Sequence, residues 1–110
     1  MDYNEHMTAH RRLAILQLLS EAVAYTLHEV DLKKSLLARG QAVSTDVLRA
    51  QLQWLHEQGL VLAKQPDGIW LATLTATGGD VRRGLSTVPG VARPEPFTSA
   101  TLSASTQGRT

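Results

Sequence analysis

The chain has 110 residues, an apolar fraction of 43% and a formal net charge of +1, which allows at most one small domain with a modest core. It contains no cysteine, which excludes a disulfide framework and a thiolate metal site. No apolar run approaches the roughly 18 residues of a membrane-spanning helix, and the polar N-terminus lacks a signal-peptide pattern, so we expect a cytoplasmic protein with no membrane partner.

Two helices are expected in the first 40 residues. The first is predicted over residues 8–23, after a frayed lead-in of residues 1–7, because large apolar residues recur along one side. Residues 25–27 are expected to form an extended piece that becomes an edge strand of a later hairpin. The second helix is predicted over residues 28–38. Its apolar residues available to the core are Val30, Leu32, Leu36 and Leu37.

A third helix followed by a hairpin is the clearest pattern in the chain. The helix is predicted over residues 44–58, with Ser44 or Thr45 as its N-cap and Gly59 in a left-handed conformation at its end. Residues 60–62 then open a strand, and 66–68 form a Pro-Asp-Gly turn. The returning strand is predicted over residues 69–75. The apolar residues expected on one side of this helix are Val47, Leu48, Leu52 and Leu55.

The region after the hairpin changes in composition. Residues 75–84 are expected to start a fourth helix, weakened by Gly78-Gly79, which we interpret as a break between strand and helix. In residues 85–110, Ser, Thr, Pro and Gly make up 14 of 26 positions, which predicts an extended or disordered tail. The segments 88–91 and 94–97 could still pack as a strap across a neighbouring surface. The predicted folded domain is therefore residues 1–84.

The predicted order of helix, strand, helix, turn, helix, strand, turn, strand resembles a winged helix-turn-helix. Residues 57–61, Glu-Gln-Gly-Leu-Val, resemble the end of a recognition helix entering the first wing strand. Residues 74–78, Leu-Thr-Ala-Thr-Gly, resemble the motif with which many bacterial winged-helix regulators leave the wing. We therefore expect a mainly α fold with a small β-hairpin, with the resemblance covering roughly residues 8–84.

A closer resemblance extends past the wing. Residues 78–84 and 88–94 are similar to a small winged-helix family of Mu-like transposable bacteriophages, whose members are often labelled ArsR-like regulators. This resemblance implies a phage or prophage origin and DNA binding, but no chemistry. The cysteine motif of true ArsR metal sensors is absent, so metal-sensing repression is not carried over.

The exposed face of the third helix is the candidate DNA-binding site. Arg49 and Gln53 lie four residues apart on one face, where they could reach base edges in the major groove. Ser44 and Thr45 begin the helix and could meet a phosphate, and Lys64 lies near the wing tip. The predicted double-stranded DNA contacts are Ser44, Thr45, Arg49, Gln53, His56 and Lys64.

The charge balance keeps other interpretations open. Residues 1–84 hold nine basic and nine acidic residues, whereas phosphate neutralisation supplies much of a DNA-binding protein's affinity. The same helix face could therefore be a plain solvated face or a protein-contact face. Trp54 and Trp70 could stack on bases or anchor a partner, but we interpret both as closing the core against the hairpin.

The predicted function is a DNA-binding phage or prophage regulator or accessory factor. The alternative is an interaction module in phage assembly or DNA packaging, with the tail docking on a phage or host protein. No enzyme, cofactor or metal is predicted, since His6 and His10 stand as an isolated pair. A homodimer is expected through helix 1 and the segment after the wing. The residues proposed for it are Leu13, Leu16, Val23, Val81 and Leu85.

Overall fold

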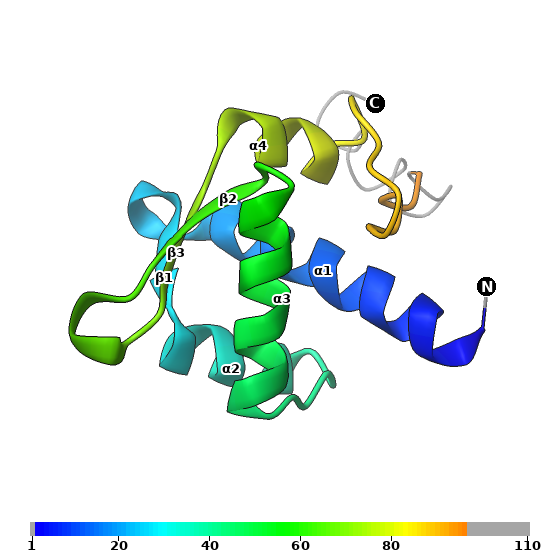
Figure 1. Ribbon diagram of the computed structural model, residues 1–110. Coiled ribbons are helices and arrows are strands. Elements are labelled where there is room, and N and C mark those ends of the chain that lie inside the picture. Colours follow the sequence, from blue (N-terminus) through cyan, green and yellow to red (C-terminus); the bar gives the residue numbers. More distant parts are fainter. Residues whose placement is uncertain (1, 97–110) are drawn as a thin grey trace, which may run out of the picture.

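The computed structural model describes residues 2–96 and contains four helices and three short strands in that part of the chain (Figure 1). The elements are α1 Tyr3–Glu21, β1 Thr26–His28, α2 Glu29–Ala38, α3 Thr45–Glu57, β2 Val61–Lys64, β3 Leu71–Leu74 and α4 Ala76–Arg82. One-turn 3-10 helices occupy residues 23–25 and 66–68. The predicted mainly α class with a small β-hairpin is confirmed, and the element order is compatible with a winged helix-turn-helix.

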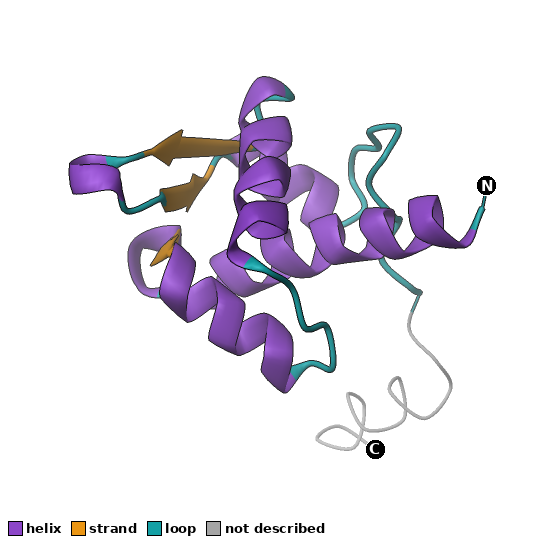
Figure 2. Ribbon diagram, turned by 60° about the horizontal axis from the view of Figure 1, so that its bottom comes forward, coloured by secondary structure: helices purple, strands orange, loops and turns teal. Residues whose placement is uncertain are grey.

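The sheet has the strand order β1-β3-β2, and both pairings are antiparallel. Thr26 pairs with Thr73, and their hydroxyl oxygens lie 2.8 Å apart. The predicted edge strand is thereby confirmed, one residue later than expected. β2 and β3 form the hairpin that we call the wing, and Figure 2 shows this small sheet to one side of the helices.

The core lies between the three long helices and the inner face of the sheet. Leucines of α2 and α3 meet Ile15, Leu16 and Leu19 of α1, and Ala72 closes the cluster from β3. α3 has the predicted bounds within one residue, because the Ser44 hydroxyl caps its first turn and Leu48, Leu52 and Leu55 recur on one buried side. Burial of these leucines fixes α3 against α2.

The first helix differs from the prediction at its start. α1 begins at Tyr3 rather than near residue 8, because the Asp2 carboxylate accepts a hydrogen bond of 2.8 Å from the Glu5 backbone N–H. Such a cap satisfies a backbone donor that would otherwise be unpaired. The frayed lead-in expected over residues 1–7 is therefore wrong for the part that the structure describes.

Two apolar residues of α2 were wrongly expected in the core. Val30 and Leu37 are 50% and 62% exposed, whereas Leu32 and Leu36 are fully buried. Val30 and Leu37 are seven residues apart and therefore share one face of the helix, whereas Leu32 and Leu36 lie on the opposite face. The second helix therefore carries two apolar stripes, of which the domain itself covers one.

The two glycines after the wing lie inside α4, so the predicted break between strand and helix is wrong. A Cβ placed on Gly78 would come within 2.0 Å of the Leu60 carbonyl oxygen. Glycine is thus required by the close approach of α4 to the residue that precedes β2.

At the other end of the wing, Asp67 and Gly68 adopt positive φ angles of 53° and 79°, and the returning strand starts at Leu71 rather than Ile69.

Residues 88–92 form a strap that folds back on α1 and α3. Val91 is buried, and the Ala92 N–H donates to the Ala9 carbonyl at 3.1 Å. Figure 1 shows this segment returning alongside α1. The packed unit therefore continues past residue 84, with the predicted strap lying on the domain's own surface. Of the second predicted strap segment, Phe97 lies outside the described residues, as does the tail from 98 to 110.

The two tryptophans pack against the core as predicted, but not both of them at the hairpin. Trp54 and Trp70 are both partly buried against the core. Trp70 precedes β3 in the wing, whereas Trp54 lies beneath the strap rather than the hairpin, with the Arg12 guanidinium 3.7 Å from its ring centroid.

Of the residues predicted to form a dimer interface, Leu13, Leu16 and Val81 are buried in this core. Only Val23 and Leu85 of that set are exposed.

Candidate functional site

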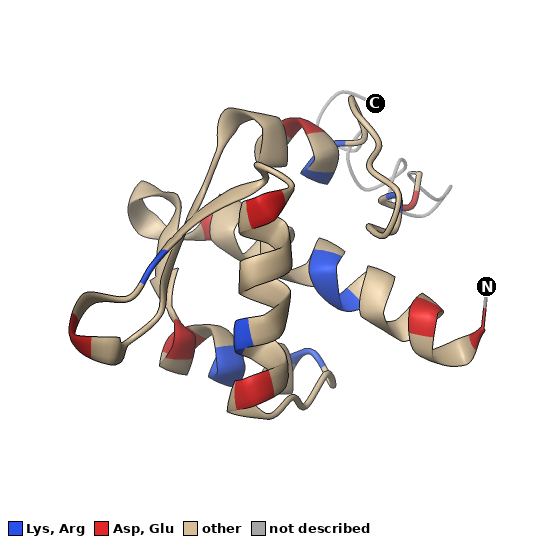
Figure 3. Ribbon diagram, viewed as in Figure 1, with Lys and Arg blue, Asp and Glu red and all other residues tan. Residues whose placement is uncertain are grey.

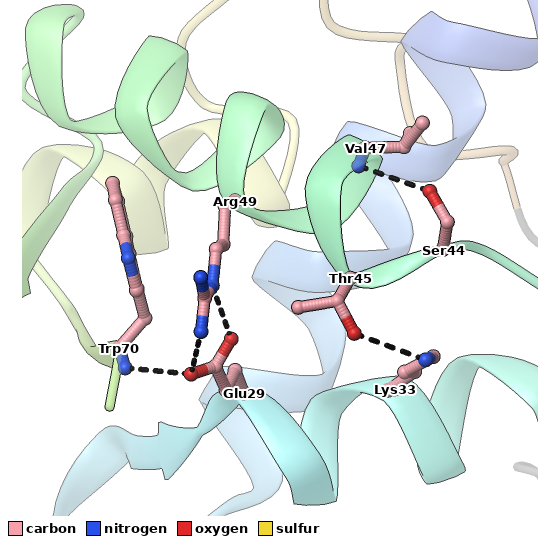
Figure 4. Close-up of polar contacts among 7 residues, drawn as sticks. All are labelled: Glu29, Lys33, Ser44, Thr45, Val47, Arg49 and Trp70. Atoms are coloured by element: carbon pink, nitrogen blue, oxygen red, sulfur yellow. Dashed lines mark hydrogen bonds and ion pairs between the residues drawn. The ribbon is translucent and has the colours of Figure 1, made fainter. Parts of the chain in front are cut away.

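The start of α3 lies beside α2 at a group of polar side chains. The Ser44 hydroxyl accepts a hydrogen bond of 3.2 Å from the Val47 N–H, and the Thr45 hydroxyl accepts one of 3.0 Å from the Lys33 ammonium (Figure 4). Lys33 is exposed on α2. The structure therefore places a cation next to the helix N-terminus, where backbone N–H groups and the helix dipole already favour an anion.

Arg49, in the middle of α3, is held by a carboxylate from α2. Its guanidinium donates two hydrogen bonds to Glu29, at 2.7 and 2.9 Å. Glu29 is 6% exposed and also accepts a bond of 3.0 Å from the Trp70 N–H (Figure 4). One carboxylate thus joins the start of α2, the middle of α3 and the approach to β3. We call these three residues the carboxylate clamp.

The clamp shifts the pKa values of both charged partners. The hydrogen bonds from Arg49, and with them the Trp70 N–H, lower the pKa of Glu29 against the opposing effect of burial. The same contact raises the pKa of Arg49. The clamp is therefore ionised at neutral pH, and two of the Arg49 donors that sequence reasoning assigned to base edges are directed at Glu29 instead.

The remaining predicted residues lie along α3 and on the wing. Gln53 is exposed and donates a bond of 3.1 Å to Glu57 one turn later. His56 accepts a bond of 3.1 Å from the Ala63 N–H through Nδ1, which ties the end of α3 to β2. Lys64 is exposed at the end of β2. Of the six predicted residues, Ser44, Gln53 and Lys64 are exposed, and the other three are partly buried.

Charge is mixed on this side of the molecule. Figure 3 shows Lys and Arg alternating with Asp and Glu along α2, α3 and the wing. Lys33, Lys34 and Lys64 supply exposed cations, but Asp46 and Glu57 lie on the same helix as Gln53. A duplex that approached this face would meet both signs of charge, which limits the electrostatic part of its affinity.

The residues that sequence reasoning missed are on α2. Glu29 was not among the predicted site residues, although it begins α2, where a carboxylate is favoured by the helix dipole. Lys33 was not among the predicted contacts either, although it bonds to Thr45 at the start of α3. The available signal was the pair of adjacent lysines between the apolar residues Val30 and Leu37.

Other constellations add little within residues 2–96. The rings of His6 and His10 lie 4.4 Å apart between centroids, and no group of three His, Asp or Glu side chains in the described part could hold a metal ion. No helix of residues 2–96 is long and apolar enough to cross a membrane.

Comparisons with known proteins identify relatives in a phage and in a bacterium. The chain is 42% identical to gp26 of Escherichia phage Mu, an uncharacterized protein, over 93 residues, which cover 84% of this chain and 96% of gp26. It is 37% identical to an uncharacterized protein of Haemophilus influenzae over 76 residues, which cover 68% of this chain and 74% of that protein. No protein-family model and no solved structure matches the chain.

Proposed function

This chain belongs to the family of gp26 of Escherichia phage Mu, and we propose that it is a winged helix-turn-helix protein that binds double-stranded DNA. In this proposal it serves a Mu-like phage or prophage as a transcriptional regulator or an accessory DNA-binding factor. α2 and α3 form the helix-turn-helix, α3 enters the major groove and the wing contacts the DNA backbone. No catalytic residue, metal or cofactor takes part.

The observation that carries this proposal is the placement of α3. Three buried leucines hold one side of the helix, and the opposite side exposes polar side chains such as Gln53. Figure 1 shows α3 across the front of the molecule, with the tip of the wing projecting beyond it to one side. A helix held by its apolar face, with a hairpin beside it, has the geometry for simultaneous contact with a groove and its flanking backbone.

The proposed contacts divide by chemistry. Gln53 has an amide that can bond adenine in the major groove, and Thr45 can contact several bases. Lys33 and the N–H groups at the start of α3 would meet a phosphate, and Lys64 a second phosphate from the wing. Arg49 positions α3 through Glu29. Contacts of this kind to few phosphates predict weak binding that depends modestly on salt.

A titration of labelled duplex DNA tests the proposal. Fluorescence anisotropy at low and moderate salt should give a Kd of about 1–10 µM at low salt and a log–log salt slope of about −2 to −3, as expected for two or three phosphate contacts. Duplexes should include fragments from the neighbourhood of the protein's own gene. Absence of binding to every fragment at low salt would exclude DNA binding by this chain.

Two charge reversals locate the binding face. Lys64→Glu should weaken binding about tenfold and reduce the salt slope by about 1, because it removes one phosphate contact. Arg93→Glu makes the same change of charge at an exposed residue just beyond the strap and should have a much smaller effect. Equal losses of DNA affinity in the two variants would mean that DNA does not bind at α3 and the wing.

A second candidate function is a protein-interaction module in phage assembly or DNA packaging. The balance of charges on α2, α3 and the wing favours it (Figure 3), because a protein partner does not require a cationic surface. Pairing of two copies is a separate proposal that now rests on exposed Val23 and Leu85. Equilibrium sedimentation that detects only a 12.0 kDa species at high concentration would exclude it.

A further inference from the structure

A groove of about 570 Å³ lies between α2 and the start of α3. Its walls include Val30 and Leu37, which are 50% and 62% exposed, and its base includes Val43 and Leu48. Val30 and Leu37 lie two helical turns apart on one face, so they present apolar side chains about 10 Å apart along the helix. This is the apolar stripe of α2 that the domain does not cover.

The rim of the groove is positively charged. Lys33 and Lys34 are exposed beside Val30 and Leu37. Among the described residues that line the groove, Glu29 is the one acid, and its charge is matched by Arg49 in the carboxylate clamp. The groove therefore carries an excess of two positive charges around an apolar base, in a molecule whose net charge is only +1.

The combination of apolar base and basic rim selects among occupants. A second copy of this chain that paired through the same groove about a two-fold axis would bring two more lysines against the rim, and like charges in an interface are unfavourable. Duplex DNA suits the lysines, but contacts to the phosphate backbone are polar and would leave Val30 and Leu37 without an apolar partner. A protein segment with apolar and acidic side chains satisfies both parts of the groove.

We propose that this groove binds an acidic amphipathic helix of a partner protein. Large apolar side chains spaced three, four and seven residues apart would pack between Val30 and Leu37, and flanking Glu or Asp residues would meet Lys33 and Lys34. The apolar anchors supply the binding free energy, whereas the lysines fix orientation and favour an acidic partner. This surface goes beyond the proposed DNA contacts, which lie mainly on α3 and the wing and share only Lys33 and Thr45 with the groove.

Synthetic helices titrated into isotope-labelled protein test the proposal. The probe is a peptide of about 14 residues with leucines at positions i, i+3 and i+7 and glutamates beside them. One control peptide has every glutamate replaced by lysine, and a second has the leucines replaced by serine. The glutamate peptide should shift the backbone amide signals of Val30, Leu37 and Val43 with a Kd of about 100 µM, and both controls should bind at least about tenfold more weakly.

Surface variants assign the binding to the groove. Leu37→Ser should weaken binding about tenfold, because it removes an exposed anchor, whereas Tyr3→Ser, at a residue of α1 that is 74% exposed and does not line the groove, should leave binding unchanged. Lys34→Glu should reduce the preference for the glutamate peptide over the lysine peptide. Lys34 is chosen because the proposed DNA site uses Lys33, so loss of peptide binding and loss of DNA binding can be told apart.

Three results would overturn the proposal. The first is the absence of amide shifts in the groove at millimolar peptide, and the second is equal binding by wild type and Leu37→Ser. The third is a duplex that shifts the Val30 and Leu37 signals when the glutamate peptide does not. That last result would assign the groove to DNA and leave the proposed function in place.

Discussion

Two arginines join distant segments of this molecule by different means. Arg49 of α3 donates to a buried carboxylate, Glu29 of α2, in the carboxylate clamp. Arg12 of α1 lies over the Trp54 ring. Its guanidinium donates a hydrogen bond of 3.0 Å to the Gly90 carbonyl of the strap and one of 2.7 Å to the Gln51 side-chain oxygen. One site pairs opposite charges, whereas the other uses a ring, a carbonyl and an amide. We call the second site the aromatic clamp.

The pKa shifts of the two arginines differ in sign, which shows how the sites differ physically. The Glu29 carboxylate raises the pKa of Arg49, whereas burial lowers the pKa of Arg12. A charged partner thus compensates Arg49 for its loss of water, and Arg12 receives compensation only from dipoles and a π face. At the carboxylate clamp, α2 and α3 are therefore joined by opposite charges, whereas the strap is joined to α1 by neutral groups.

Removal of Glu29 should have the largest effect on stability. Glu29→Ala leaves the Trp70 N–H without its acceptor and Arg49 without its counter-charge. The unpaired N–H and the unpaired charge together predict a loss of about 2–3 kcal/mol in the free energy of unfolding. Urea denaturation followed by circular dichroism measures it. Asp31→Ala removes an exposed carboxylate of the same helix and should cost less than about 1 kcal/mol. Equal losses in Glu29→Ala and Asp31→Ala would show that the carboxylate clamp does not stabilise the fold.

Gly90→Ala should have the next largest effect, confined to the strap. Gly90 has a φ of +97°, and an added Cβ would lie 2.9 Å from both Arg12 and Trp54. Backbone strain and crowding together should cost about 2 kcal/mol. Hydrogen exchange at the Ala92 N–H, which bonds to Ala9, should quicken, while exchange in α3 changes little.

Gly68 provides the matched control for this substitution. It also has a positive φ, +79°, but an added Cβ would meet nothing within 4 Å. Gly68→Ala should therefore cost only the backbone strain, about 1 kcal/mol. If the two alanines cost the same, crowding against Arg12 and Trp54 does not hold the strap.

The same contrast explains which parts of the fold could be predicted from the sequence. Local signals sufficed for α3, because the Ser44 cap, three leucines and Gly59 act within one helix. The fold class and the edge strand followed from the order of such signals. The start of α1 was missed because its first turn is polar, and a single Asp2 cap determines it.

Long-range contacts account for what could not be predicted. Glu29 lies 20 residues from Arg49, and no local pattern indicates that they meet. α2 has two apolar stripes, and the sequence does not say that Leu32 faces the core while Leu37 faces outward. Gly78 has the local pattern of a helix break, and the reason for a glycine there is the close approach of Leu60, which is distant in the sequence. Each of these depends on a partner that only the fold supplies.

Arg12→Ala should have a smaller effect than Glu29→Ala and Gly90→Ala. It removes a cation–π contact and hydrogen bonds at a partly exposed site, for an expected loss of about 1 kcal/mol. Since Arg12 has a ring and neutral oxygens as partners, this loss should be similar at low and high salt. The loss in Glu29→Ala should shrink modestly as salt rises, because the Arg49 side chain is 39% exposed although Glu29 is buried. Denaturation at two salt concentrations measures both, and an equal salt dependence would remove the distinction between the clamps.

The smallest expected effect is the pH dependence of the carboxylate clamp. Arg49 lowers the pKa of Glu29 in the folded state below its ordinary value of 4.5. The unfolded chain therefore binds the Glu29 proton first as pH falls, so the stabilisation is complete above about pH 5.5 and declines from about pH 4.5 downward, through the folded-state pKa.

The variant Glu29→Gln lacks this titration. Urea denaturation between pH 6 and pH 3 should show wild type losing more stability than the variant, so that the two converge. Arg12→Ala should follow the wild-type pH profile, because the aromatic clamp contains no group that titrates in this range, and a pH-dependent difference there would show that both sites depend on charge.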